Sequence, residues 1–358
     1  MAKSVRLADI AEKVGVSVVT VSKALSGQKG VSEQMREKII KLADELGYKQ
    51  PSTSVKENSE GTGYNIGILI HEKHFSKYNS FYLQMYQILS AKLSDMLGYS
   101  MLEIITYNME NELILSNMLR DKRVSALVLL GEFSNEYCAF LKKSISVPMV
   151  YLDFNDENQE MQSVISDSFY GSYYLTNYLF KKGHRDIAFV GSLLETESIT
   201  DRYLGYLKAM MEHGITPGKD RIVEDRDKDT GIIFEAHKFR LPSKMPTAFV
   251  CNCDLTAGEL IKKLAEKGYR VPEDISVVGY DNFIFPGVCD VKITTYEVDM
   301  KQMVDRTISI IDNLLQGKPV DQHVHIVTGH IVEKESVRAI PFGKEDKRAE
   351  EIQLRALL

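Results

Sequence analysis

Apolar side chains recur every three or four positions in three short segments near the N-terminus, and this spacing predicts three amphipathic helices before residue 47. Gly15 favours a tight turn between the first two helices, because it adopts a left-handed backbone conformation at little cost. Ser17 is a favourable N-cap for the second helix, and the third runs from Ser32 to about Leu46. This arrangement is typical of a helix-turn-helix, although an ordinary amphipathic hairpin has the same pattern. The inward faces of the first two helices contain Leu7, Ile10, Ala11, Val14, Val21, Ala24 and Leu25.

From Tyr64 onward, short apolar runs alternate with longer amphipathic segments. Near-continuous apolar strands between helices indicate parallel sheets that are covered on both faces. Because about 290 residues exceed one typical domain, we expect two α/β lobes. The runs predict strands at 66–70, 101–106, 126–130, 148–152, 164–166, 186–190, 248–250 and 275–278, and the pattern between them predicts helices that include 81–96, 169–181, 201–213 and 255–267.

The connector between these two parts is polar and rich in serine, threonine and glycine, which is the composition of a flexible linker. We therefore divide the chain into a helix-turn-helix domain at 1–50, a linker at 51–63, a two-lobed body at 64–341 and a charged tail at 342–358. The tail holds at most two heptads, whereas a tetramerising coiled coil needs about three or more. A frayed amphipathic end is the expectation for the tail.

Charge is distributed unevenly along the chain. Residues 1–50 carry nine Lys and Arg against six Asp and Glu, a net charge of +3, whereas the whole chain carries −6. Such an asymmetry between an N-terminal module and its acidic body suggests that contact with nucleic acid is restricted to the module.

Several kinds of chemistry have no signature in the sequence. There is no Gly-rich phosphate loop and no nucleophile elbow, so we expect neither an enzyme nor a bound cofactor. The histidine pairs at 71 and 74 and at 323 and 325 lack convincing carboxylate or thiolate company, so no metal site is expected. Four scattered cysteines fit a reducing cytosol, and no signal peptide or membrane-spanning run is present, which predicts a cytoplasmic protein.

Short motifs throughout the chain resemble those of the lac repressor (LacI/GalR) family of bacterial transcription regulators. The N-terminal motifs are Asp9-Ile-Ala11, Val14-Gly-Val-Ser17, Thr20-Val-Ser22, Val31-Ser32, Arg36 and Leu46-Gly-Tyr48. The motifs of the body are Ile66-Gly-Ile-Leu69, Val147-Pro-Met-Val-Tyr-Leu-Asp153, Lys182-Gly-His-Arg-Asp-Ile-Ala188, Arg202-Tyr-Leu-Gly-Tyr206, Val271-Pro-Glu-Asp-Ile-Ser-Val-Val-Gly-Tyr-Asp281 and Ile293-Thr-Thr295. The resemblance implies an all-α helix-turn-helix domain followed by a two-lobed fold similar to periplasmic sugar-binding proteins. In that fold the chain crosses between the lobes three times, here near Ser166, Val291 and His325.

The same resemblance implies which residues contact DNA. It places Val18, Val19 and Lys23 at the base edges of the major groove, and Ser17, Thr20 and Ser22 at phosphates. The two valines offer only apolar contact, which suits thymine methyl groups, whereas Lys23 can approach guanine acceptors or a phosphate.

The linker departs from the family pattern, which has an Ala-Arg pair followed by a leucine that wedges into the minor groove. Here Glu57-Asn-Ser59 occupies that region, and polar side chains are not driven between stacked bases by apolar burial. We therefore expect weak or absent kinking of the operator.

A ligand cleft is expected beyond the carboxyl ends of the parallel strands. Asp153 and Asp281 follow predicted strands and Arg202 begins a helix, so the resemblance implies that all three contact an effector. Carboxylates and an Arg fork suit a polyhydroxylated ligand, because each makes pairs of hydrogen bonds. The alternative is that these are strand-end or cap carboxylates paired with surface lysines.

Two features blur the identity of that ligand. Cys253 stands where the family usually presents an asparagine, and the aromatic platform often found after the Arg202 helix is replaced by the charged run Glu224-Asp225-Arg226-Asp227. Phe81, with Tyr82 beside it, either stacks on the effector or packs in the core.

The sequence thus predicts a homodimeric repressor that binds a pseudo-palindromic operator and responds allosterically to a small molecule, of which a sugar is the first choice. The alternatives are a cytoplasmic sugar-binding or sugar-processing α/β protein and a nucleobase-responsive regulator.

Overall fold

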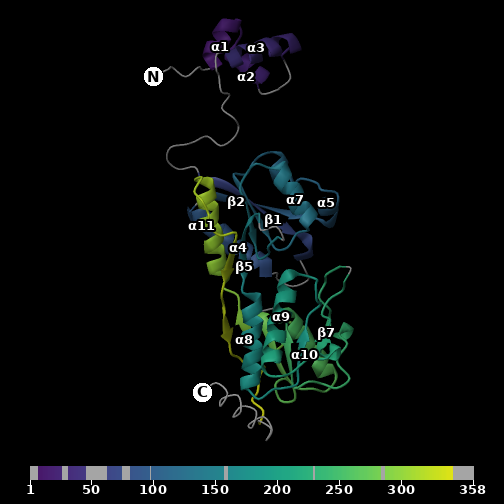
Figure 1. Ribbon diagram of the computed structural model, residues 1–358. Coiled ribbons are helices and arrows are strands. Elements are labelled where there is room, and N and C mark those ends of the chain that lie inside the picture. The colour runs from purple at the N-terminus through teal and green to yellow at the C-terminus, as the bar shows by residue number, and fades with distance from the viewer. Residues whose placement is uncertain are drawn as a thin grey trace. The chain divides into compact units, whose positions relative to one another are not determined.

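Three short helices form the N-terminal part of the computed structural model, which describes residues 7–25, 31–45, 63–74, 81–96, 98–156, 160–228, 230–283 and 287–341. The chain divides into two compact units, Met1–Thr62 and Gly63–Leu358, and each is considered by itself (Figure 1). The tail at 342–358 and the linker up to residue 62 lie outside the described residues, as do the expectations about them.

The first unit contains α1 (Leu7–Val14), α2 (Val18–Leu25) and α3 (Glu33–Glu45). Its small core consists of Ile10, Ala11, Val21, Ala24, Ile39 and Ala43. Gly15 has a φ of +76°, and the Thr20 backbone N–H donates to Ser17 Oγ at 3.1 Å, which caps α2. Arg36 of α3 donates from Nη1 to the Ala24 carbonyl at 2.8 Å, so that it binds a carbonyl at the C-terminal end of α2. The predicted helices, turn and cap are confirmed.

The second unit begins with a six-stranded sheet, which forms lobe 1. All of its neighbouring strands are parallel. In order across the sheet the strands are β2 (Gly98–Ile105), β1 (Tyr64–His71), β3 (Ala126–Leu130), β4 (Met149–Leu152), β5 (Gln162–Ser166) and β11 (Val324–Val327). The helices of this lobe are α4 (Phe81–Met96), α5 (Tyr107–Asn111), α6 (Asn117–Arg120), α7 (Asn135–Ser144) and α11 (Met300–Leu315).

Both faces of this sheet are buried. Ile66 and Ile68 of β1 belong to the same apolar cluster as Leu89 of α4, whereas Leu69 belongs to a second cluster with Tyr137 of α7. Figure 1 shows α4 and α11 on one side of the sheet and α5 and α7 on the other. The predicted parallel sheet with two covered faces is confirmed.

Lobe 2 repeats this topology. Its strands, in order, are β7 (Ile222–Val223), β6 (Ile187–Val190), β8 (Ala248–Cys251), β9 (Ser276–Asp281), β10 (Thr294–Glu297) and β12 (His330–Val332), and the main helices are α8 (Ser168–Lys181), α9 (Glu197–Glu212) and α10 (Asp254–Glu266). Only the β10–β12 pair in this sheet is antiparallel.

The chain passes between the lobes three times. The first crossing follows Ser166, as expected. The second is not near Val291, which precedes β10 and still belongs to lobe 2; it occurs at Asp299, whose side chain caps α11 by accepting from the Gln302 N–H. His325 lies inside β11, and the third crossing follows that strand, where the Gly329 N–H donates to the Tyr296 hydroxyl at 2.8 Å.

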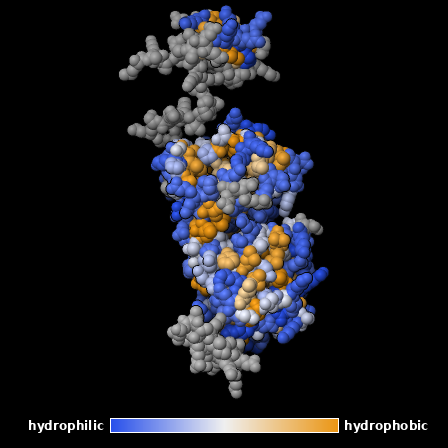
Figure 2. All heavy atoms as spheres, viewed as in Figure 1, coloured by the Kyte–Doolittle hydropathy of each residue, from blue (hydrophilic) through white to orange (hydrophobic). Residues whose placement is uncertain are grey.

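The surface of the two-lobed unit is mostly hydrophilic on the face drawn in Figure 2, with hydrophobic residues gathered in separate patches on both lobes. Among the described helices, none is both long enough and apolar enough to cross a membrane.

Candidate functional site

Asp153 and Asp281 occupy equivalent places in the two lobes. Asp153 directly follows β4 and Asp281 ends β9, and each of these strands is fourth in its sheet. Both residues have a positive φ, +69° and +101°, which residues other than glycine adopt rarely. Such strain is typical of residues held in place for a function.

The Asp153 carboxylate is bonded to a helix of its own lobe. The Tyr82 hydroxyl, from the first turn of α4, donates to Asp153 Oδ2 at 3.0 Å. Burial raises the pKa of Asp153 to about 6, against the lowering effects of the Arg202 charge and of this hydrogen bond. Asp153 therefore exchanges a proton within the physiological range.

Arg202 joins the end of β9 to the end of β8. From α9 its Nη1 donates to the Asn252 carbonyl at 2.6 Å, and its Nη2 lies 3.5 Å from Asp281 Oδ1. The guanidinium carbon lies 3.8 Å from the centroid of the Tyr280 ring, a cation–π distance. Its buried Nε has no hydrogen-bond partner among the described residues. Burial raises the pKa of Asp281 to about 7, although the Arg202 charge opposes that rise.

Cys253 begins α10 as its N-cap, with Sγ accepting from the Thr256 backbone N–H at 3.5 Å. Burial raises the pKa of this thiol to about 11, so it is neutral at physiological pH and offers a ligand only a weak hydrogen bond. The adjacent Asn252 does not replace it, because its amide donates to Asp225 Oδ2 at 2.7 Å within a buried network.

Phe81 is half-buried at the start of α4. Its ring centroid lies 5.4 Å from that of Tyr82 and 6.2 Å from that of Phe283 in lobe 2. Phe81 therefore packs between the lobes, and a role in stacking on a ligand remains a prediction.

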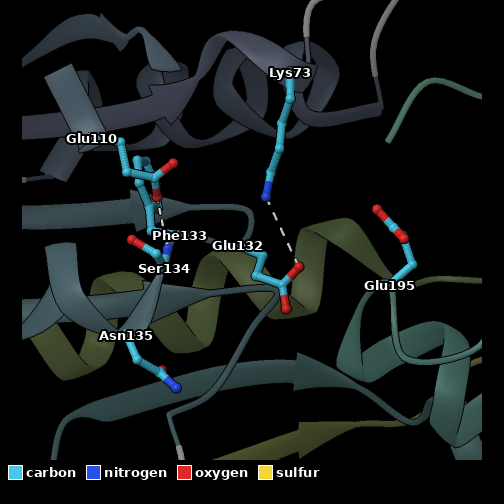
Figure 3. A pocket seen from close by; sticks show the side chains of 7 residues that line it. All are labelled: Lys73, Glu110, Glu132, Phe133, Ser134, Asn135 and Glu195. Atoms are coloured by element: carbon cyan, nitrogen blue, oxygen red, sulfur yellow. Dashed lines mark hydrogen bonds and ion pairs between the residues drawn. The ribbon is translucent and has the colours of Figure 1, made fainter. Parts of the chain in front are cut away.

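Two adjoining hollows lie beside these residues and share Glu132 as a lining residue. The larger has a volume of about 290 Å³, with Lys73 and Glu132 from lobe 1 and Glu195 from lobe 2 in its wall (Figure 3). Lys73 points toward Glu132, with Nζ and Oε2 4.0 Å apart. The smaller has a volume of about 40 Å³ and includes Asp153 in its wall. Neither Arg202 nor Asp281 is among the described residues that line the two hollows.

Sequence reasoning missed several residues of this region, of which Arg226 is the clearest. Its Nη2 lies 2.9 Å from Asp225 Oδ2, and its charge lowers the pKa values of Cys253 and Asp281. The charged run at 224–227 therefore contributes a cation, Arg226, to the region where the family often has an aromatic platform. The run itself was visible in the sequence, but not the direction in which each of its side chains points.

The first unit presents part of α2 to solvent. The core is filled by Val21 and Ala24, on the opposite face of α2. Exposed residues are therefore Ser17, Val18 and Lys23, and Thr20 is half-buried. The Val19 and Ser22 side chains lie outside the described part of the chain. In that part, no cluster of three histidine, cysteine or acidic side chains is placed to hold a metal ion.

Comparisons with known proteins agree with this architecture. Residues 6–51 match the model of the bacterial regulatory proteins, lacI family, and residues 176–337 match that of a periplasmic binding protein-like domain. The HTH-type transcriptional repressor PurR of Vibrio atlanticus is 29% identical over 336 residues, which cover 93% of this chain and 98% of that protein. PurR of Pectobacterium carotovorum subsp. carotovorum is 29% identical over 339 residues, 93% of this chain and 97% of that protein.

Solved structures with a similar fold include the lac repressor dimer bound to operator and the anti-inducer ONPF, with a TM-score of 0.62 and 22% identity over 94% of this chain and 100% of that one. The complex of the transcriptional regulator CelR with cellobiose has a TM-score of 0.64 and 20% identity over 93% of this chain and 99% of that one.

Proposed function

The chain belongs to the lac repressor (LacI/GalR) family and is a DNA-binding transcriptional repressor with an effector-binding body. From this premise we propose which residues contact DNA and what the cleft binds. We infer that the first unit docks α2 in the major groove of an operator. We also infer that the cleft between the lobes binds a polyhydroxylated small molecule, with a sugar as the first candidate.

The DNA contacts are proposed for one face of α2 and its N-cap. The exposed methyl groups of Val18, which is 45% exposed, suit thymine, and Lys23 reaches a guanine or a phosphate. The remaining contacts are assigned to Ser17, Val19, Thr20 and Ser22. A homodimer places two such helices on the two half-sites of a pseudo-palindromic operator.

The observation that carries the effector site is Arg202, which is only 7% exposed. Its Nη2 lies 3.5 Å from Asp281 Oδ1, and its Nε has no partner among the described residues. A buried donor without a partner costs free energy that a ligand acceptor recovers on binding. Vicinal hydroxyl groups both donate to a carboxylate and accept from an Arg fork, so a sugar meets both needs. Asp153 and Phe81 are proposed to contact the same ligand from lobe 1, and Cys253 from lobe 2.

Control of DNA binding follows from linkage. A ligand that contacts both lobes favours one relative orientation of the lobes, and DNA favours one spacing of the paired N-terminal units. Each ligand shifts the other only by its differential affinity for the two states, so both an inducer and a corepressor fit the scheme. We propose that the protein acts where bacterial DNA lies, in the cytoplasm, and that it returns its ligand chemically unchanged.

The test separates the two roles. An operator is selected from random duplexes, and its affinity is measured by fluorescence anisotropy with and without mono- and disaccharides. Lys23→Ala should weaken operator binding by about tenfold, or 1.4 kcal/mol, while the response to the ligand persists. Arg202→Ala should abolish that response and leave operator affinity within a few-fold. A full response in Arg202→Ala would show that the cleft assignment is wrong.

A nucleobase is the second candidate effector. The ring centroids of Phe81 and Tyr82 lie 5.4 Å apart, Tyr82 lines the smaller hollow, and aromatic side chains stack on bases. Adenine, guanine and hypoxanthine therefore belong in the same screen, and release or recruitment of the operator by one of them alone would favour this candidate.

A further inference from the structure

We propose that the effector carries a protonated amino group, which binds in the smaller hollow between Asp153 and Asp201; this inference rests on the proposed function of the cleft. The ligand is then an amino sugar or a similar aminated polyol, rather than a neutral sugar.

The smaller hollow is lined by carboxyl groups from both lobes. Glu132 and Asp153 follow strands β3 and β4 of lobe 1, and Glu197 and Asp201 lie one turn apart in the first part of α9. No lysine or arginine is among the described residues that line it. The hollow therefore concentrates negative charge, and Lys73, whose Nζ lies 4.0 Å from Glu132 Oε2, belongs to the wall of the larger hollow.

Several hydrogen-bond acceptors remain available there. The Glu197 backbone N–H donates to Glu132, and Tyr82 donates to Asp153, so one oxygen of each is engaged. The Asp201 carboxylate has neither a hydrogen bond nor an ion pair within the described part of the chain. The hydroxyl of Ser168, a residue only 4% exposed that also lines the hollow, has no partner either. An ammonium group has three donors and no acceptor, which matches this set.

Electrostatics favours the same ligand. Burial raises the pKa values of Glu132 and Asp201, and raises that of Asp153 to about 6. The nearby arginines have their ion pairs outside the hollow, because Arg202 lies against Asp281 and Arg226 against Asp225. Lys73 lies 4.0 Å from Glu132 and compensates only that carboxylate. A neutral sugar leaves the repulsion among the carboxylates in place, whereas an ammonium group replaces it with charge-assisted hydrogen bonds. Glu197 is the most solvent-exposed of the four and contributes least.

The size of the smaller hollow fits a charged substituent on a ring. A water-sized group needs about 10–15 Å³, so the smaller hollow of about 40 Å³ accepts an ammonium group but not a sugar ring. The ring therefore stays outside the smaller hollow, where Arg202 and Asp281 are proposed to contact it.

The full-length protein tests the proposal with matched probes. Binding of D-glucosamine and D-galactosamine is compared by calorimetry and thermal shift with that of D-glucose, D-galactose and N-acetyl-D-glucosamine, which lack the positive charge. At least one amine should bind about tenfold or more tighter than its neutral counterparts. Equal or tighter binding of the neutral sugars, or no binding of either amine, overturns the proposal.

A variant locates the amine. Asp201→Asn should reduce the affinity for the amine about tenfold and leave that for the neutral sugars unchanged, because only the charged group loses its partner. Asp321→Asn, at an exposed position in the loop before β11, removes the same charge outside the cleft and should have no effect. Glu132→Gln is the second variant, should Asp201→Asn fail to fold. Unchanged amine affinity in a folded variant overturns the site.

Operator binding separates this inference from the proposed function. If a neutral sugar or a nucleobase alone changes operator affinity, the proposed function stands and the amine inference falls. If an amine binds with the expected dependence on Asp201 but operator affinity stays constant, the amine site stands and the proposed control of DNA binding falls.

Discussion

The two lobes share one topology but differ in what surrounds their equivalent aspartates. Asp153 follows the fourth strand of lobe 1, Asp281 ends the fourth strand of lobe 2, and both have a positive φ. The partner of Asp153 is a neutral hydroxyl from Tyr82, whereas that of Asp281 is the guanidinium of Arg202. The shared topology therefore gives the two aspartates equivalent positions, whereas the residues of the neighbouring helices determine how each carboxylate charge is compensated.

The largest test of this difference removes the cation of lobe 2. Arg202→Ala leaves Asp281 buried without its partner and should lower the free energy of unfolding by about 3 kcal/mol at pH 8. The loss should be smaller at pH 6, because Asp281, with a pKa of about 7, then binds a proton instead. Urea denaturation at both pH values measures this. Adding Asp281→Asn should restore most of the stability, and a double variant no more stable than Arg202→Ala would contradict the pairing.

A second comparison concerns how tightly each lobe is packed at a glycine. A Cβ on Gly205 in α9 would collide with the backbone carbonyl of Phe169, whereas one on Gly67 in β1 would meet the side-chain tips of Met118 and Val124 at 3.0 Å. Side chains can move aside and packed backbone cannot. Gly205→Ala should therefore cost about 2 kcal/mol, even though alanine favours a helix, and Gly67→Ala about 1 kcal/mol or less. Similar melting temperatures for the two variants would contradict this.

The aspartates should also differ in how they couple stability to pH. Both have folded-state pKa values above the ordinary value of 3.8, at about 6 for Asp153 and about 7 for Asp281. The stability each contributes is fully present below pH 4 and is lost as the pH rises through its folded-state pKa. Asp153→Asn should abolish a loss of unfolding free energy that continues up to about pH 6, and Asp281→Asn one that continues up to about pH 7. The two losses should differ by about 1.4 kcal/mol. Unfolding free energies from pH 4.5 to 8 would refute this if the two profiles coincided.

The smallest effect is expected for the hydrogen bond of lobe 1. Tyr82→Phe removes a donor to the charged form of Asp153 and should raise the pKa of Asp153, leaving that of Asp281 unchanged. The cost in stability should be about 1 kcal/mol. Carbon-13 NMR of the carboxyl groups resolves both titrations, with Tyr99→Phe, at a residue 71% exposed, as control. Equal shifts at both aspartates would speak against separate environments.

The hydrophobic pattern predicted the strands whose faces are both buried and the amphipathic helices that cover them. The strand at 126–130 and the helix at 81–96 have the bounds expected from their apolar spacing. The pattern missed β7, which has only two residues, and also β10, β11 and β12, whose sequences contain Thr, Glu and His. In addition, β11 and β12 lie at sheet edges, and Ile326 of β11 is 60% exposed. The second crossing, which the family resemblance placed near Val291, occurs at Asp299, after β10.

The expectation that ligand contacts lie beyond the carboxyl ends of parallel strands identified Asp153 and Asp281, but it also applies to other strands. Glu132 follows β3 in the same manner, with only Gly131 between them, and could have been found. Arg226 could not, because its position depends on a bridge to Ile233 that pairs two irregular segments. Ser168 has no local signal at all, since it joins the hollow only through the packing of α8 against α9.

The three crossings also set an order for biosynthesis. Lobe 1 is completed by α11 and β11, at residues 300–315 and 324–327, although the rest of it is made before residue 167. During translation the sheet of lobe 1 stays incomplete, with the edge of β5 unpaired, until residues 324–327 have left the ribosome. Neither lobe is a continuous length of chain, so a stop codon before residue 300 removes part of both, and a single proteolytic cut releases neither intact.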